Sequence, residues 1–219
     1  MIQGEAGCID IQIYDLIQAF DALWLDALPE ESRDDKLALL YDINKKNKVA
    51  VNTAGGQTER IDVNKIVTQG GTWGSLLCSN HIDSLGRECR KRGENIYLYK
   101  NQVEVLPLAM VDDLVGIAKC GHNSLDLNTF INTQIELKKL QFHTPDEKGK
   151  SKCNVMHVGK DTGICPKLEV HGTKMQKITQ DTYLGDIVSS DGKNDANIAS
   201  RVSKGLGIVT QITNMLEKV

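Results

Sequence analysis

The sequence predicts a mixed α+β fold, in which short strands alternate with helices along 219 residues. Three observations favour this class. Residues 9–14 alternate isoleucine with Asp, Gln and Tyr, the two-residue period of a half-buried strand that ends near Asp15. Residues 106–120, LPLAMVDDLVGIAKC, place apolar flanks on both sides of Asp112 and Asp113, which is typical of two buried strands joined at a tight turn. Stretches with apolar residues at helical spacing separate these strands.

Composition is that of an ordinary globular protein with a real core, at 40% hydrophobic and 25% charged residues. No apolar run approaches the roughly 20 residues that cross a bilayer, and the first ten residues do not form a signal peptide. We therefore expect a soluble, intracellular protein with no membrane partner. Six cysteines without a CxxC pair fit reduced thiols better than a disulfide framework.

Charge is unevenly distributed along the chain. Residues 1–40 contain nine acidic and two basic side chains, a net charge of −7, whereas the remaining 24 bases and 20 acids give +4. Nucleic-acid-binding proteins usually show a stronger basic excess. A nucleic-acid partner must therefore be argued from a specific site.

The first third of the chain predicts two helices and a hairpin after the opening strand. Apolar side chains recur at helical spacing over residues 16–27, and Pro29 opens a second helix that runs to about Asn44. Asp15 thus lies at a strand end, where an ordinary cap or turn aspartate is the alternative to a functional one. Residues 48–63 read as two strands around a Gly55-Gly56 turn.

The middle of the chain predicts two amphipathic helices. A glycine-containing loop precedes a helix over residues 75–92, and glycines before a helix N-terminus permit close approach of an anionic substrate, although a plain loop explains them equally well. The second helix spans residues 124–143. The inward-facing residues expected for the two helices are Leu76, Leu77, Ile82 and Leu85, and Leu127, Phe130, Ile131, Ile135 and Leu140.

The last third predicts strands over residues 153–159, 167–170 and 182–188, a turn at 189–192 and a final helix. The final helix carries an apolar stripe of Ile198, Val202, Leu206, Val209, Ile212 and Leu216. A zinc site built from Cys153, His157, Cys165 and His171 is disfavoured, because the gaps between these residues match no common ligand spacing. Core thiols and surface histidines are the preferred interpretation.

Asp112 and Asp113 form the strongest candidate site. Two adjacent negative charges between apolar strands require compensation. Magnesium is the usual compensator, since it prefers a few carboxylate oxygens together with water and substrate phosphate. A solvated hairpin turn is the alternative on these residues alone.

The order of these pieces resembles the reverse transcriptase palm, particularly that of non-LTR retrotransposons. The matching segments, in chain order, are residues 15–21, 67–77, 109–113, 151–156 and 183–185. This resemblance covers almost the whole chain. It implies an antiparallel sheet with helices on one face, in which residues 1–165 form the palm core. Residues 166–192 would then be late palm strands that include Tyr-Leu-Gly, and residues 193–219 the start of the thumb.

The sequence departs from the family pattern at several places. Thr72 stands where the second motif commonly has proline, Gly74-Ser75 stands where Ser-Pro is expected, and Met110 replaces Tyr or Phe. Only fourteen residues precede the first motif, so the fingers are expected to be missing. The chain thus resembles a palm fragment of a longer retroelement protein, or a decayed copy.

The resemblance implies an RNA-directed DNA polymerase that adds nucleotides to a primer 3′ end. Asp15, Asp112 and Asp113 would hold two Mg²⁺ ions, with Mn²⁺ as a substitute, and the Leu16 carbonyl would add a ligand. Lys152 would donate a proton or positive charge to the pyrophosphate, although Lys148 and Lys150 nearby fit a surface-lysine interpretation.

The remaining implied roles concern substrates. Phe20 would lie beneath the incoming sugar and exclude a 2′-hydroxyl, with an ordinary core position as the alternative. Gln69, Gly70 and Ser75 would border the nascent base pair. The primer-grip region would be Tyr183, Leu184 and Gly185. Implied partners are an RNA template, a DNA primer, dNTPs and a fingers segment, with cytoplasmic and nuclear localisation.

Two other functions stay open on the sequence alone. One is a catalytically inactive remnant with weak nucleic-acid binding. The other is a different two-metal palm enzyme, such as a DNA-templated polymerase or a nucleotide cyclase. The Gln-Gly loop followed by Asp-Asp and Tyr-Leu-Gly disfavours this last class.

Overall fold

The computed structural model describes residues 8–17, 48–62, 74–92, 96–98, 103–110, 112–145, 151–159 and 167–216. The two helices predicted over residues 16–44 therefore lie outside the described residues, apart from residues 16 and 17, and so does Phe20. The same holds for Gln69 and Gly70. Among the described helices, none is both long and apolar enough to cross a membrane.

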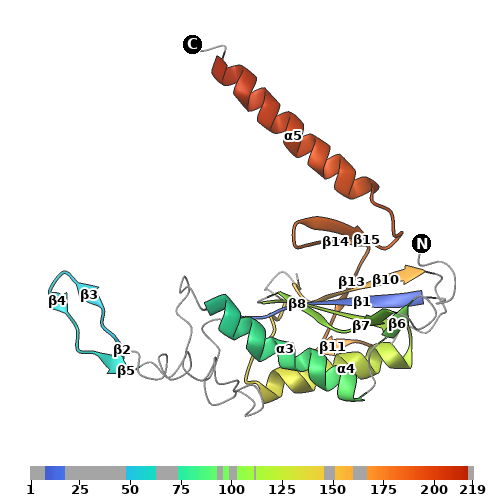
Figure 1. Cartoon of the computed structure of the whole chain (residues 1–219), viewed down its shortest axis with the longest axis horizontal. Helices are drawn as coiled ribbons and strands as arrows, with labels where there is room; N and C mark the ends of the chain where they lie inside the picture. Colours follow the sequence, from blue (N-terminus) through green and yellow to red (C-terminus); the bar gives the residue numbers. More distant parts are fainter. Residues whose placement is uncertain are drawn as a thin grey trace.

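A five-stranded sheet forms the centre of the molecule (Figure 1). Its spatial order is β13 (Gln176–Ile178), β10 (Asn154–Gly159), β1 (Cys8–Asp15), β9 (Asp113–Lys119) and β8 (Leu108–Met110). The first predicted strand is thus the central one, antiparallel to both of its neighbours. The expected all-antiparallel sheet is wrong at one edge, because β13 runs parallel to β10.

Both described helices of the middle segment lie on one face of this sheet, as Figure 1 shows. They are α3 (Gly74–Arg92) and α4 (His122–Leu137), so the α+β class with helices on one face is confirmed. α4 ends before the predicted His143, because the chain turns at Lys139, which adopts a positive φ of 56°. Leu76, predicted to face inward, is 46% exposed.

The hydrophobic core lies between the sheet and these helices. α3 contributes Leu77, Ile82 and Leu85. α4 contributes Leu127, Phe130, Ile131 and Ile135, and Tyr14, Leu16 and Leu114 come from the sheet side. The Arg92 guanidinium lies 5.1 Å from the centre of the Phe130 ring, which links the two helices by a cation–π contact. The predicted inward faces of both helices are therefore largely confirmed.

The buried face of β1 is its polar one. Gln12 and Tyr14 are 0% and 1% exposed, whereas Ile11 and Ile13 are only partly buried. Gln12 Nε2 donates to the Ser124 carbonyl at 2.7 Å and to its hydroxyl at 2.9 Å. The Tyr14 hydroxyl donates to Gln12 Oε1 at 2.5 Å, and burial raises the pKa of this phenol above its usual range. The network satisfies the polar groups that fasten β1 to α4.

Short hairpins surround the sheet. The expected hairpin at residues 48–63 is confirmed as β2 (Lys48–Val49) paired with β5 (Ile61–Asp62), and β3 (Asn52–Thr53) with β4 (Gly56–Gln57). The other small pairs are β6 (Ile96–Leu98) with β7 (Val103–Val105), and β11 (Glu169–Val170) with β12 (Thr173–Lys174).

Residues 182–188 are not the single strand predicted. They belong to a hairpin of β14 (Gln180–Tyr183) and β15 (Asp186–Ser189). Leu184 and Gly185 form its two-residue turn with φ values of 48° and 87°, the geometry that matches the twist of paired strands and that glycine adopts without strain. The hairpin ends at the predicted turn, where Gly192 donates to the Ser189 carbonyl at 3.0 Å.

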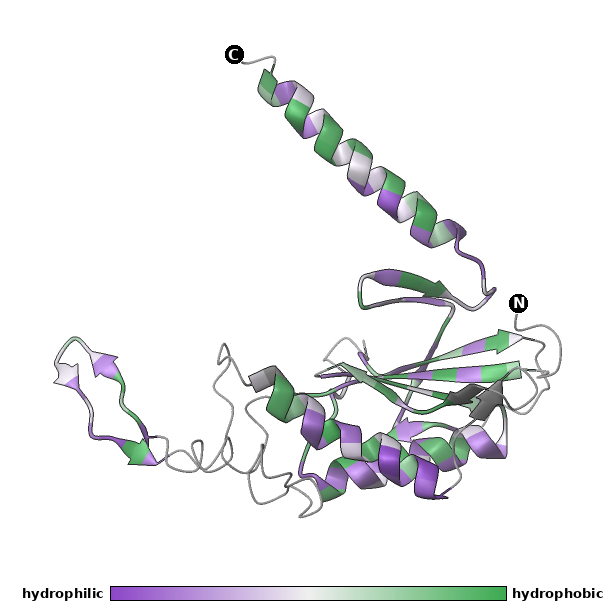
Figure 2. Cartoon of the chain, viewed as in Figure 1, coloured by the Kyte–Doolittle hydropathy of each residue, from purple (hydrophilic) through white to green (hydrophobic). Residues whose placement is uncertain are grey.

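The predicted final helix is confirmed as α5 (Asp195–Leu216), which extends away from the sheet (Figure 1). None of its residues is buried. Figure 2 shows apolar and polar residues along the whole helix. The predicted division into 1–165, 166–192 and 193–219 stays a prediction, and β13 from the second segment joins the same sheet as β1.

A close approach at Gly116 gives the first prediction. A Cβ at this position would lie 2.9 Å from Ile131 Cδ1 and 3.1 Å from Leu127 Cδ2. We expect Gly116→Ala to lower the free energy of unfolding by about 1 to 3 kcal/mol through overpacking, measured by urea titration. Gly205→Ala in α5 is the matched control, because no heavy atom lies within 4 Å of its Cβ position. Equal destabilisation by both would contradict the packing argument.

Burial of His81 predicts a pH-dependent stability. The side chain is 0% exposed, and neither ring nitrogen has a hydrogen-bond partner among the described residues. Burial, and to a smaller extent the nearby Lys138 charge, lowers the pKa of His81 to about 4. Between pH 6.5 and 4 the unfolded chain therefore binds a proton that the folded chain does not. Stability is present above pH 6.5 and falls as the pH drops through this window, by about 2 to 3 kcal/mol.

The measurement is urea unfolding at a series of pH values from neutral to acid. His81→Leu removes the titrating group and should flatten the profile in this window. An unchanged slope in His81→Leu would show that other groups produce the acid destabilisation.

Candidate active site

The strand register brings Asp15 and Asp113 together. They are direct partners in the last pair of the β1 and β9 ladder. Asp112 precedes Asp113 in the turn from β8, and its backbone carbonyl accepts a hydrogen bond from the Leu16 amide at 3.3 Å. The register thus places Asp15 beside the Asp-Asp pair, on the neighbouring strand. That the three carboxylates share metal ions stays a prediction. Asp112 lies in the turn and Asp113 begins β9, and both are exposed to solvent. β8 is exposed along its length, so the prediction of two buried strands is wrong for β8.

One lysine faces this acidic cluster. The Lys152 ammonium lies 2.9 Å from Asp15 Oδ2, with the lysine side chain 61% exposed and the aspartate 22% exposed. Partial burial raises the pKa of Asp113, the charges of Asp112 and Asp15 raise it further, and Lys152 lowers it. The cluster therefore carries more negative charge than its protein surroundings compensate, which favours binding of a cation.

Cys153 contacts the backbone of Asp15. The sequence did not single out this residue for the site. Its Sγ accepts a hydrogen bond from the Asp15 amide at 3.5 Å and donates to the His143 carbonyl at 3.5 Å. The His143 amide in turn donates to the Asp15 carbonyl at 2.9 Å. Burial raises the pKa of the Cys153 thiol to about 11, so it acts as a neutral packing group. Its position next to Lys152 in the chain is the one sequence signal for this role.

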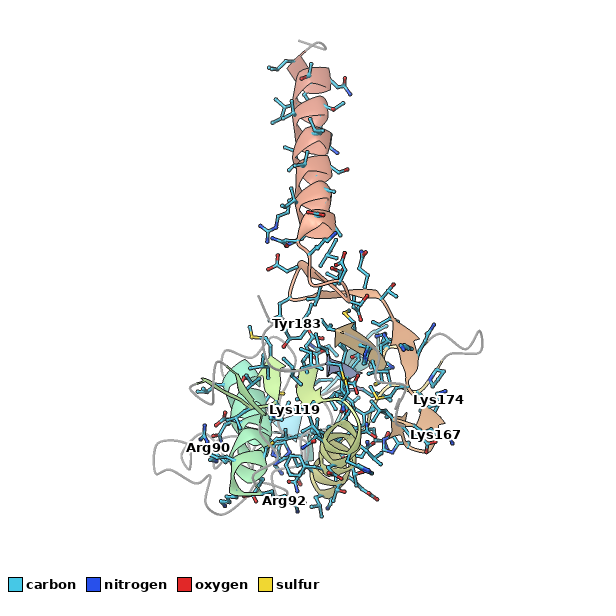
Figure 3. The ribbon with its side chains drawn as sticks, turned by 90° about the vertical axis from the view of Figure 1, so that its right-hand side faces the viewer. Arg90, Arg92, Lys119, Lys167, Lys174 and Tyr183 are labelled. Carbon is cyan, nitrogen blue, oxygen red and sulfur yellow. The ribbon has the colours of Figure 1, made fainter. Side chains whose placement is uncertain are left out.

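The Tyr-Leu-Gly hairpin borders the same cluster. Burial raises the pKa of Tyr183, and the charge of Asp113 raises it further, which indicates that the phenol and this carboxylate are close enough to interact. Figure 3 places Tyr183 between the base of α5 and the sheet. Leu184 is 57% exposed at the turn beside Gly185. The structure therefore brings the predicted primer-grip tyrosine toward the aspartates.

The structure does not place the other predicted site residues at the aspartate cluster. Phe20, Gln69 and Gly70 lie outside the described residues. Ser75 belongs to the first turn of α3, and its side chain is outside the described set. Leu16 is 2% exposed and forms a bridge with Phe142, so its side chain belongs to the core.

The donor set fits hard divalent cations. Three carboxylates and backbone carbonyls are the oxygen ligands that Mg²⁺ and Mn²⁺ prefer. The three aspartates do not form a trio whose ligand oxygens all lie within 4.8 Å of one another among the described residues. Lys152 is exposed enough to leave Asp15 when another cation approaches. The cross-strand pair of Asp15 and Asp113, with Asp112 next to it, is the structural observation that supports a metal here.

Comparison with known proteins shows the fold class. No family model and no curated protein sequence matches the chain. A solved structure of telomerase from Candida tropicalis, in complex with a fragment of telomeric RNA, matches 87% of this chain with a TM-score of 0.56 and 14% identity. An apo structure of the same telomerase without its C-terminal domain matches 86% with a TM-score of 0.43 and 14% identity.

The first of these matches supports a reverse-transcriptase-like fold, since telomerase is a reverse-transcriptase-related polymerase. This chain spans 30% of that telomerase chain. At this identity the likeness concerns the fold alone.

Proposed function

We propose that the chain is the palm of an RNA-directed DNA polymerase, of the non-LTR retrotransposon type, that adds dNTPs to a primer 3′ end. The observation that carries this proposal is the cross-strand pair of Asp15 and Asp113 beside Asp112, at an open end of the central sheet. Two Mg²⁺ ions bound there would supply the charge that activates the attacking hydroxyl and neutralises the leaving pyrophosphate.

The residues of the chain act by positioning charge. Asp15 and Asp112 would hold the ions, and Asp113 would complete the acidic cluster. The hydrogen bond from the Leu16 amide to the Asp112 carbonyl fixes the turn against β1, so the aspartates keep their spacing while substrate binds. Lys152 stays close to Asp15 and is exposed enough to reach the pyrophosphate. Tyr183 and Leu184 support the primer end from their hairpin.

A nucleic-acid substrate is supported by the telomerase match, since that structure is a complex with a fragment of telomeric RNA. Because this chain spans 30% of that protein, we propose that polymerisation needs a fingers segment in addition. That segment would orient the triphosphate, and positioning is most of what phosphoryl transfer asks of a protein.

Primer extension on an RNA template with magnesium tests the proposal. We expect the chain alone to be nearly inert, and an upstream fingers segment, fused or added in trans, to produce dNTP-dependent extension. Extension only on a DNA template would indicate a DNA-templated palm enzyme instead. Failure under every reconstitution would favour the inactive remnant.

Duplex binding provides a separate prediction. The chain has a net charge of −3, and its first forty residues are rich in acidic side chains, which repel phosphates. We therefore expect weak binding to an RNA–DNA duplex that falls steeply with salt. Fluorescence anisotropy between about 50 and 200 mM salt measures this slope. Tight binding that salt does not change would contradict the proposed mode of contact.

A further inference from the structure

A second cluster of metal-binding side chains lies at the other end of β1. Cys8 begins this strand and Asp15 ends it, so a separation of about 20 Å along the strand divides the two sites. The ligand atoms of Cys8, Cys120 and His157 all lie within 4.8 Å of one another. None of these residues takes part in the proposed polymerase chemistry.

The strand register explains why these side chains meet. Asp10 of β1 is the direct partner of His157 on β10, and Ile9 is the direct partner of Lys119 on β9. Cys120 follows Lys119 and donates its amide to the Cys8 carbonyl at 3.4 Å, which continues the ladder by one position. Cys8 and Asp10 are two residues apart and therefore point to the same face of the sheet. Three strands thus contribute to one polar cluster.

Two of the three distances among Cys120, His157 and Asp10 match those between ligands of a tetrahedral ion. Cys120 Sγ lies 3.4 Å from His157 Nδ1 and 3.6 Å from Asp10 Oδ1. His157 Nδ1 lies 2.9 Å from Asp10 Oδ1. With Zn–S near 2.3 Å and Zn–N or Zn–O near 2.0 Å, the edges of a zinc tetrahedron are about 3.3 to 3.8 Å. Shifts of a few tenths of an ångström would bring these atoms into that geometry.

The cluster is largely shielded from solvent, with Cys120 its partly exposed member. The side chains of Asp10 and His157 are 4% and 13% exposed, and Cys8 is 8% exposed as a residue. His157 Nε2 is buried without a hydrogen-bond partner among the described residues, so the ring is oriented through Nδ1 alone. Structural zinc sites are closed in this way and use all four positions for protein ligands.

We propose that Cys8, Cys120, His157 and Asp10 form a structural site for a thiophilic divalent cation, of which Zn²⁺ is the best fit. Two thiolates and an imidazole nitrogen are the donors that zinc prefers over magnesium. Binding releases the two thiol protons, so the site with Zn²⁺ and the ionised Asp10 carries a net charge of −1. The ion joins β9, β1 and β10 at the strand ends remote from the aspartates.

The Cys120 thiol is neutral without a cation. Burial raises the pKa of the Cys120 thiol, and its hydrogen bond with Cys8 and the charge of Asp10 raise it further. A coordinated cation reverses this preference and deprotonates its thiol ligands. This zinc set differs from the disfavoured group of Cys153, His157, Cys165 and His171. Cys153 and His157 are four residues apart along one extended segment, about 13 Å, which is too far for one ion.

Cobalt substitution of the reduced, chelator-treated full chain tests the proposal. We expect one equivalent of Co²⁺ to give the visible bands of a tetrahedral site with a thiolate-to-metal charge-transfer band, and one equivalent of Zn²⁺ to remove them. Cys8→Ser and Cys120→Ser should lose these bands. Cys89→Ala, in the core side of α3, should retain them as the matched control. Bands that survive Cys8→Ser would place the metal elsewhere and overturn the assignment.

Two measurements on the unmodified sequence guard against variants that fail to fold. X-ray absorption of the zinc-loaded chain should report two sulfur and two nitrogen or oxygen ligands. Zinc should also raise the unfolding temperature of the wild type and of Cys89→Ala. A wild-type chain that takes up no zinc under reducing conditions would refute the site. Mass spectrometry could instead find a Cys8–Cys120 disulfide in the metal-free protein. If the two thiols still bind no zinc after this disulfide is reduced, the site is refuted as well.

Discussion

Asp112→Asn is expected to abolish primer extension by the reconstituted polymerase, with a loss of at least about 100-fold in rate. The reason is electrostatic. The proposed site holds two doubly charged ions with three carboxylates, and the substitution removes one negative charge while it preserves the shape of the side chain. Because Asp112 is exposed in a turn, the free energy of unfolding should change little.

Asp15→Asn should have a comparable effect on the rate, since Asp15 faces Asp113 across the strand pair. Asp126→Asn is the matched control, because Asp126 is an exposed aspartate on α4 outside the cluster. The rates are compared in single-turnover extension with magnesium, and a chelator should stop all active variants. Restored extension that survives Asp112→Asn would show that the chemistry lies elsewhere in the reconstituted protein.

Ile131→Ala is expected to be the most destabilising of the substitutions considered, by about 2 to 5 kcal/mol. Ile131 is 0% exposed in the core between α4 and the sheet, and its Cδ1 lies against Gly116. The truncation removes buried apolar surface and leaves a cavity, because the backbone of β9 on one side and α4 on the other restrict collapse. A loss of this size is a large part of the stability of an ordinary domain.

Urea unfolding followed by circular dichroism measures this loss. Ile212→Ala removes the same atoms from a residue of α5 that is 52% exposed, so it should cost less than about 1 kcal/mol. A similar loss in both variants would mean that α5 packs in solution on a surface that covers its apolar stripe. A negligible loss in Ile131→Ala would contradict the assignment of the core.

The candidate aspartate site was largely predictable, because its residues are marked by local contrast. Two acids inside an apolar run, and a third at the end of an alternating strand, stand out in any hydropathy profile. The contribution of Cys153 was not predictable. A single thiol in a strand is most often a core residue, and only the β1–β10 pairing places it under Asp15.

The sequence by itself determined the α+β class, the position of most strands and helices in the described part of the chain, and the turn at Asp112, since these depend on local periodicity and turn chemistry. It also determined the inward faces of α3 and α4, apart from Leu76. These features need no information about distant parts of the chain. The tertiary structure decided which elements lie side by side.

Three consequences follow from that pairing alone. The polar face of β1 is buried because Ser124 and Asn128 of α4 satisfy Gln12 and Tyr14, a partnership between residues more than 100 positions apart. Leu184 and Gly185 form a turn because β14 pairs with β15 rather than with the central sheet. Cys8, Cys120 and His157 meet because strand order, which depends on long-range packing, places β9 and β10 on either side of β1.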